Sequence, residues 1–117
     1  MPASATLLTT GCLLGMRDKP GMYFQPPYFP ALCNYIYGVE DCYRHSDEPL
    51  FEELANFTDW LPKHFGIIQP SFGWRQIIQE RANEDHERVQ LFVDLFLQHR
   101  QECKFFWEQT GITQRSS

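Results

Sequence analysis

Residues 84–107 read EDHERVQLFVDLFLQHRQECKFFW, and this stretch decides the fold. Its apolar residues recur at steps of three and four, which places them on one face of an α-helix. Asn83 is a candidate N-cap, and Glu84 and Asp85 follow where the helix dipole favours negative charge. We therefore predict a long amphipathic helix whose buried face is formed by Val89, Phe92, Val93, Phe96, Cys103, Phe106 and Trp107.

The same spacing predicts four further helices upstream. The first covers residues 4–16, and an aromatic loop rich in proline follows it over residues 17–29. The second helix begins near Pro30 and ends near Arg44. The third helix is capped by Ser46 or Asp47, has Pro49 in its first turn and ends between Pro62 and Gly66. The fourth helix is short and is capped by Ser71. Gly38 interrupts the second helix, and such a glycine is typical of a close approach by a neighbouring element.

The fold class that follows is all-α, in a single compact domain of about five helices over residues 1–117, with frayed ends at 1–3 and 113–117. A chain of 117 residues buries enough surface to hold a core without crosslinks. Apolar residues make up 43% and aromatic residues 15%, which excludes a disordered chain.

Several classes of function are disfavoured by composition. No apolar run reaches the roughly 18–20 residues that span a membrane. The net charge of −5 disfavours a protein that grips nucleic-acid phosphates. The N-terminus lacks the cationic region of a secretory signal, so we expect a cytoplasmic protein whose four cysteines are reduced and mostly buried.

The negative charge is concentrated in one stretch. Residues 40–59 contain seven acidic residues and a single arginine, a net charge of −6. Residues 1–39 sum to +1, and residues 60–117 sum to zero. The third predicted helix, in the second half of this stretch, places Glu52, Glu53, Asn56 and Asp59 mostly opposite its apolar face.

No motif for catalysis is present. His99 and Cys103 are one helical turn apart and could share a metal ion, but two further ligands at a defined spacing are missing. The glycines form no phosphate-binding loop. We therefore expect no catalytic residue, no metal and no cofactor.

The acidic stretch has two interpretations. A solvated helix face is the simpler one. The other is a docking surface for a cationic protein, because clustered carboxylates speed association with such a partner. Tyr37 lies off the apolar stripe of its helix and would serve as an aromatic anchor. The predicted partner-binding residues are Tyr37, Glu40, Asp41, Asp47, Glu48, Glu52, Glu53 and Asp59.

Short motifs spread over the chain support the second interpretation. They are Arg17-x-x-Pro20 followed by Met22-Tyr23, Gly38 in a helix, Phe57-x-x-Trp60, Gly73-Trp74-x-x-Ile77, and the phenylalanine-rich run at 92–96. This pattern resembles small bacterial helical immunity proteins encoded beside polymorphic toxins. The resemblance implies a protein that binds and neutralises one cognate toxin, and it carries no catalytic residues with it.

The hypothesis from the sequence is therefore an immunity protein that occludes a toxin with a basic active site, through the surface around residues 40–59. The alternative is a non-catalytic helical scaffold or a subunit of a larger assembly. A small enzyme with Cys/His chemistry is a weaker third option.

Overall fold

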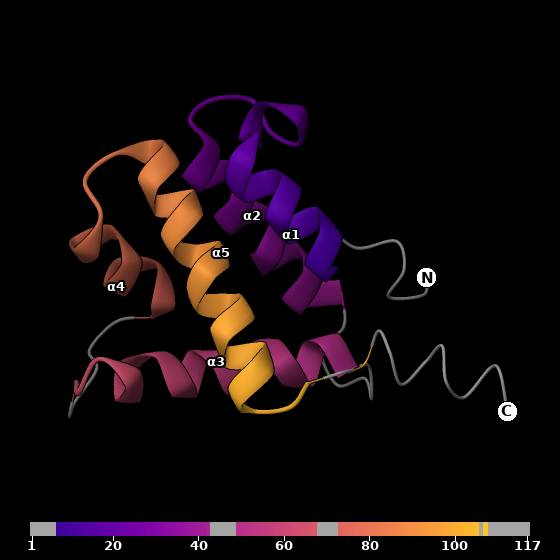
Figure 1. Cartoon of the computed structure of the whole chain (residues 1–117), viewed down its shortest axis with the longest axis vertical. Coiled ribbons are helices and arrows are strands. Elements are labelled where there is room, and N and C mark those ends of the chain that lie inside the picture. Colours follow the sequence, from indigo (N-terminus) through magenta and orange to yellow (C-terminus); the bar gives the residue numbers. More distant parts are fainter. Residues whose placement is uncertain (1–6, 43–48, 68–72, 106, 108–117) are drawn as a thin grey trace, which may run out of the picture.

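The computed structural model describes residues 7–42, 49–67, 73–105 and 107. These residues form five α-helices and one 3₁₀ turn, with no β-strand among them (Figure 1). The elements are α1 (Thr10–Asp18), η2 (Pro20–Met22), α2 (Tyr28–Cys42), α3 (Pro49–His64), α4 (Trp74–Arg81) and α5 (Asp85–Glu102). The prediction of an all-α single domain with a long C-terminal helix is confirmed.

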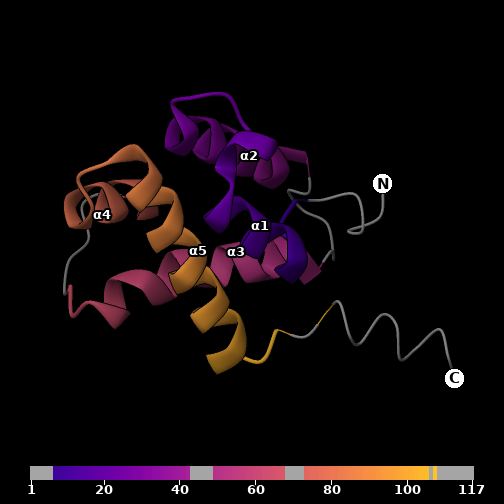
Figure 2. The same ribbon diagram turned by 45° about the horizontal axis from the view of Figure 1, so that its top comes forward.

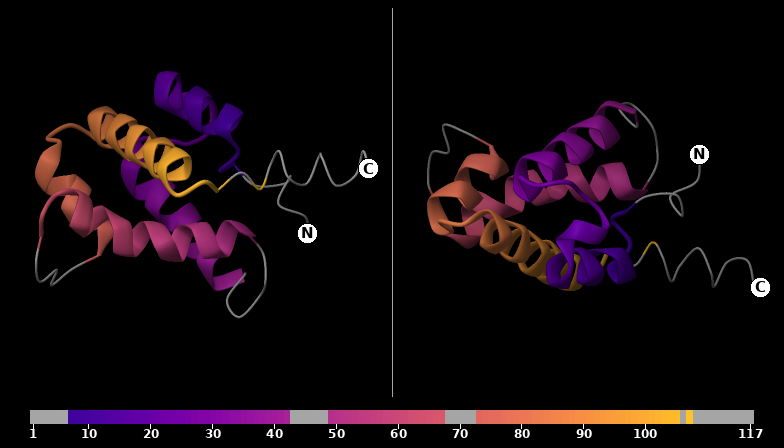
Figure 3. Two further views of the ribbon diagram at one scale, coloured as in Figure 1. Left: turned by 60° about the horizontal axis from the view of Figure 1, so that its bottom comes forward. Right: turned by 90° about the horizontal axis from the view of Figure 1, so that it is seen from above.

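Helix α5 is the centre of the fold. It contacts each of the other four α-helices. Figures 1 and 2 show α4 on one side of α5 and α1 on the other, and Figure 3 shows α3 crossing it at an angle. The face of α5 that was predicted to be apolar is buried, with Val89, Phe92, Val93 and Phe96 fully inaccessible.

Aromatic rings join three helices to this face. Phe57 of α3 packs edge-to-face on Phe92 and Phe96, with ring centroids 5.7 and 5.0 Å apart. Trp74 of α4 lies 5.2 Å from Phe92 and 6.4 Å from Phe29 of α2. Such pairs contribute about 0.5–1.5 kcal/mol each beyond the area that they bury. The rings therefore fix how α2, α3 and α4 sit around α5.

The start of α2 is held by a side chain from another helix. Both carboxylate oxygens of Asp85 accept backbone hydrogen bonds, from Tyr28 N at 2.5 Å and Phe29 N at 2.7 Å. The negative charge also sits at the positive end of the α2 dipole. Pro30 lies in the first turn of α2, as predicted.

Three predicted helix starts differ from the structure. α1 begins at Thr10 rather than residue 4, because the Thr9 side chain accepts a hydrogen bond from Cys12 N and caps it there. α4 begins at Trp74 with Gly73 as its N-cap, and the predicted cap Ser71 lies outside the described residues. α5 is capped by Glu84 rather than Asn83, because the Glu84 and Glu87 side chains form a reciprocal capping box.

The ends of α3 and α5 share one geometry. Gly66 has φ 71° after α3, and Ile67 N bonds to Pro62 O, as a Schellman cap requires. This agrees with the predicted end between Pro62 and Gly66. Lys104 has φ 60° after α5, and Phe105 N bonds to Arg100 O in the same pattern.

The prediction that one helix continues through Cys103 to Trp107 is therefore wrong. The left-handed Lys104 turns the chain after Glu102. Phe106 and the caps Ser46 and Asp47 lie outside the described residues.

The glycines of the helices have different surroundings. A Cβ atom at Gly38 would meet nothing within 4 Å among the described residues, so the prediction of a close approach there is wrong. The close approach occurs instead at Gly15 of α1, where a Cβ would lie 2.6 Å from Tyr23 Oη and 3.3 Å from two ring carbons. The ring of Tyr23 uses the space that glycine leaves.

Gly11 and Gly15 therefore predict opposite effects of alanine. We expect Gly11→Ala to raise the free energy of unfolding by about 0.5–1 kcal/mol, because alanine favours the helix and nothing lies near its Cβ. We expect Gly15→Ala to lower it by about 1 kcal/mol or more, because Tyr23 must move. Urea denaturation followed by circular dichroism measures both, and Tyr23→Phe should relieve part of the second effect. Equal stabilisation by both alanines would contradict this packing.

Candidate functional site

The structure separates the predicted partner-binding residues into distinct groups. Tyr37, Glu40 and Asp41 lie in the C-terminal half of α2, and Glu52, Glu53 and Asp59 lie in α3. The other two, Asp47 and Glu48, lie outside the described residues. The predicted single surface is therefore carried by two different helices.

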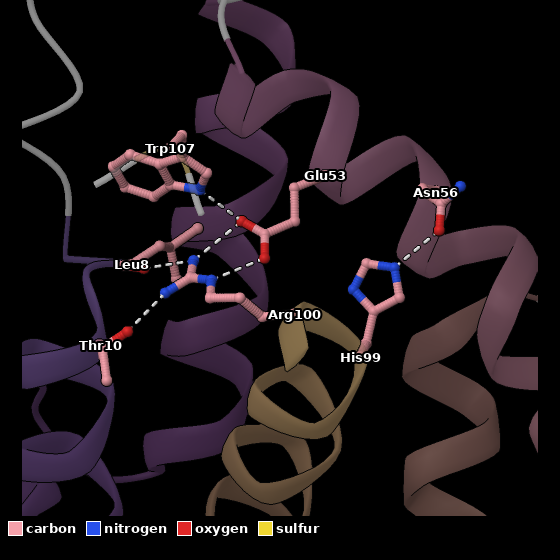
Figure 4. A network of polar contacts seen from close by, with 7 residues as sticks. All are labelled: Leu8, Thr10, Glu53, Asn56, His99, Arg100 and Trp107. Atoms are coloured by element: carbon pink, nitrogen blue, oxygen red, sulfur yellow. Dashed lines mark hydrogen bonds and ion pairs between the residues drawn. The ribbon is translucent and has the colours of Figure 1, made fainter. Parts of the chain in front are cut away.

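Glu53 was expected on the outer face of α3, and this prediction is wrong. Its side chain is fully buried, because it follows Leu50 by three residues and precedes Phe57 by four, on the inward face of the helix. The carboxylate is paired with Arg100 of α5, which is 5% exposed. Arg100 Nε donates to Glu53 Oε2 at 2.7 Å, and Arg100 Nη2 donates to Oε1 at 2.8 Å (Figure 4).

Further hydrogen bonds complete this buried pair into a network, which we call the Glu53–Arg100 network. Arg100 Nη2 also donates to Leu8 O at 2.8 Å, and Nη1 donates to Thr10 Oγ1 at 3.0 Å. Trp107 Nε1 donates to Glu53 Oε1 at 2.8 Å, and its ring lies 5.1 Å from the guanidinium carbon. The network joins Leu8, which precedes α1, and Thr10 of α1 to α3, to α5 and to Trp107. Because a buried ion pair is favourable only when its polar atoms are satisfied, this cluster is structural rather than a docking surface.

His99 lies one residue before Arg100 and is also fully buried. Its Nε2 is 2.7 Å from Asn56 Oδ1, and its Nδ1 has no hydrogen-bond partner among the described residues (Figure 4). Aromatic rings surround it, with Phe57 at 5.4 Å, Trp60 at 5.3 Å and Phe105 at 5.4 Å. This burial lowers the pKa of His99 to about 4, and the nearby charge of Arg100 adds to the effect. The imidazole is therefore neutral at pH 7.

The sequence carried a signal for both buried groups. Arg100 falls on the apolar stripe of α5, four residues after Phe96 and seven after Val93. Glu53 falls on the apolar stripe of α3 in the same way. Two opposite charges on inward faces are best explained by pairing with each other.

The exposed carboxylates of α3 lie on its outer face. Glu52 and Asp59 are two turns apart, and the exposed Asn56 and Lys63 share that face with them. Glu52, Asp59 and Lys63 are therefore exposed to solvent on this face, whereas Asn56 also bonds His99 beneath it.

The residues of α2 form the second exposed group. Tyr37 is 42% exposed, as its position off the apolar stripe predicted. Its ring rests on Trp74 of α4, with the ring centroids 5.8 Å apart, and the Arg75 side chain lies near its hydroxyl. Asp41 is exposed and Glu40 is half-buried. Tyr37 therefore faces α4 rather than α3.

The thiols are only partly as predicted. None of the four cysteines is in a disulfide. Cys33 is buried, and burial raises the pKa of its thiol to about 12, which keeps it unreactive. Cys12 and Cys103 are half-buried and Cys42 is exposed, so the expectation of mostly buried thiols is wrong. Among the described residues no group of three His, Cys, Asp or Glu side chains could hold a metal ion.

No protein-family model matches the chain, no curated protein matches it, and no solved structure matches it. In the part of the chain that the structure describes, every helix is too short or too polar to cross a membrane.

The Glu53–Arg100 network predicts that replacing the buried Arg100 lowers the free energy of unfolding far more than replacing an exposed arginine does. We expect Arg100→Met to lower the free energy of unfolding by about 3–5 kcal/mol, because it leaves a buried carboxylate without its counter-ion. The matched control is Arg17→Met, which breaks an exposed pair with Asp94 at 2.9 Å and should cost less than about 1 kcal/mol.

Urea unfolding measures both variants. The double variant Glu53→Leu/Arg100→Met should recover much of the loss, because it removes both charges together. A cost for Arg100→Met no larger than that for Arg17→Met would show that the network does not stabilise the fold.

His99 predicts a loss of stability in acid. Its pKa is about 4 in the folded protein and near 6.5 in the unfolded chain, so only the unfolded chain binds the proton between these values. The free energy of unfolding should therefore fall by about 3 kcal/mol as the pH drops from 6.5 to 4.

The control for this loss is His99→Phe, which keeps an aromatic ring among its neighbours and leaves Asn56, an exposed residue, to water. Urea unfolding at a series of pH values should give a shallower slope for this variant. Identical slopes for the two proteins would exclude His99 as the titrating group.

Proposed function

We propose that this chain is an immunity protein, a non-catalytic protein that neutralises a cognate toxin by covering a basic surface of it. The observation that supports this most is the exposure of Asp41, Glu52 and Asp59 in the segment that carries the charge of the protein, with the exposed Tyr37 just before that segment.

The charge of that segment remains large after Glu53 is set aside. Glu53 is neutralised by Arg100, and the rest of residues 40–59 still sums to −5. The rest of the sequence carries no positive charge of comparable size, because residues 1–39 sum to only +1 and residues 60–117 sum to zero. A field of one sign raises the association rate with a partner of the opposite sign.

The chemistry of the partner follows from this field. Enzymes that act on nucleic acids or nucleotides carry clustered lysine and arginine side chains to hold phosphate. A helical domain with exposed carboxylates can occupy such a site and exclude the substrate. Neutralisation is then stoichiometric, and no residue of this chain needs to react.

The experiment is co-expression with the toxic domain that this hypothesis places beside the gene. The wild-type chain should restore growth and form a 1:1 complex with that domain, and added salt should weaken the complex. The variant Glu52→Lys/Asp59→Lys should lower the affinity by about 10- to 100-fold. The control Asp18→Lys/Glu80→Lys makes the same change of charge on exposed residues outside the segment and should lower it less than about threefold.

Three outcomes would contradict the proposal. Absence of growth rescue by the wild-type chain would exclude neutralisation. A complex without rescue would favour the alternative, a helical scaffold or assembly subunit. Equal effects of the two double variants would show that the acidic segment is not the recognition surface.

A further inference from the structure

The outer face of α2 has an unusual composition for a solvated helix. Asn34, Tyr37, Gly38 and Asp41 follow one another at steps of three, one and three, so they lie on one face. All four are exposed, while Leu32, Ile36 and Val39 on the opposite side are in the core. We call these four residues the α2 outer face.

Gly38 is the first reason to regard this face as a contact surface. Its φ is not positive, so the backbone does not require glycine. No described residue lies within 4 Å of where its Cβ would be, so no packing within that part of the chain requires glycine either. Glycine in a helix interior makes the helix less stable than alanine does. No contact or backbone conformation in the described part of the chain requires this loss of stability. Gly38 therefore leaves the helix surface beside Tyr37 without a side chain.

Tyr37 is the second reason. Its ring packs against Trp74 and the Arg75 side chain lies nearby, so its inner side is supported while 42% of it stays exposed. An aromatic side chain that is already immobilised loses little entropy when a partner covers it. Tyrosine is also among the residues that dominate binding energy at protein interfaces.

The charge of the segment decides the kind of occupant. Asp41 is exposed at one end of the face, and the acidic stretch begins at its neighbour Glu40. We infer that the α2 outer face is the centre of contact with a basic protein partner, which lays backbone or a small side chain over Gly38, packs on Tyr37 and directs a cationic side chain at Asp41. This inference rests on the proposed function and narrows it to one helix. Glu52 and Asp59 on α3 then attract the partner from a distance without forming the centre of the interface.

Substitution at Gly38 provides the test, because it separates binding from stability. Gly38→Gln should leave the protein as stable as the wild type or more stable, since it restores a good helix former. The binding partner in this test is an inactivated form of the toxic domain that the proposed function places beside the gene. Gly38→Gln should nevertheless raise the rate at which the complex with this domain dissociates by about 30-fold or more. Tyr37→Ala should raise that rate by about 100-fold.

The matched control is Gly11→Gln. Gly11 is also an exposed helical glycine with nothing within 4 Å of its Cβ position, but it lies on α1. This variant should bind as the wild type does. Kinetics by biolayer interferometry should show a further division, with Glu52→Lys/Asp59→Lys acting mainly on the association rate.

The outcomes separate this inference from the proposed function. If the wild-type chain binds and Gly38→Gln and Tyr37→Ala bind equally well, the α2 face is excluded while neutralisation stands. If the wild-type chain does not bind the toxic domain, the proposed function and this inference both fail. If light scattering shows a wild-type dimer that Gly38→Gln dissociates, the occupant is a second copy of the chain and the inference is overturned.

Discussion

The Glu53–Arg100 pair constrains the structure more than any other interaction. Two charges taken out of water are tolerated only when their polar atoms meet partners. Here the two groups bond each other, and their other partners are Leu8 before α1, Thr10 of α1 and Trp107. The pair also fixes the rotation of α3 about its own axis. Because Glu53 must point at α5, Glu52 and Asp59 must point at solvent. The exposed charge on α3 is thus a consequence of the buried charge beneath it.

Polar groups of the interior and of the surface therefore have different roles. The interior groups are bonded within the described chain, apart from Nδ1 of His99, and they set the geometry. On the surface, Tyr37 is supported by α4 from below and open to solvent above, and Gly38 leaves space beside it. Rigid support under an exposed aromatic ring favours recognition, because the side chain loses its conformational entropy when the protein folds and loses little more when a partner binds.

The periodicity of apolar residues was sufficient to predict the helices, their order and most of the core, including Phe92, Phe96 and Phe57. It was insufficient for the ends of the helices, because these depend on single side chains such as Thr9 and on the left-handed Lys104, for which the sequence carries no turn signal. The misplacement of Glu53 had another cause. A charged side chain predicts exposure, but the spacing from Leu50 and Phe57 places Glu53 on the inward face of α3. Its pairing with Arg100, 47 positions away, depends on tertiary structure.

The central position of α5 has a consequence for the order in which the chain can fold during synthesis. All four other helices pack on this element, which is the last of them to leave the ribosome. Until it emerges, the apolar faces of α1 to α4 have little to bury against and Glu53 has no counter-ion. Arg100 bonds Leu8, which precedes it by 92 positions, so closure of the core waits for nearly all of the described chain. The nascent protein is therefore expected to stay open and then to close in one late cooperative step, and only the closed form supports Tyr37 on Trp74.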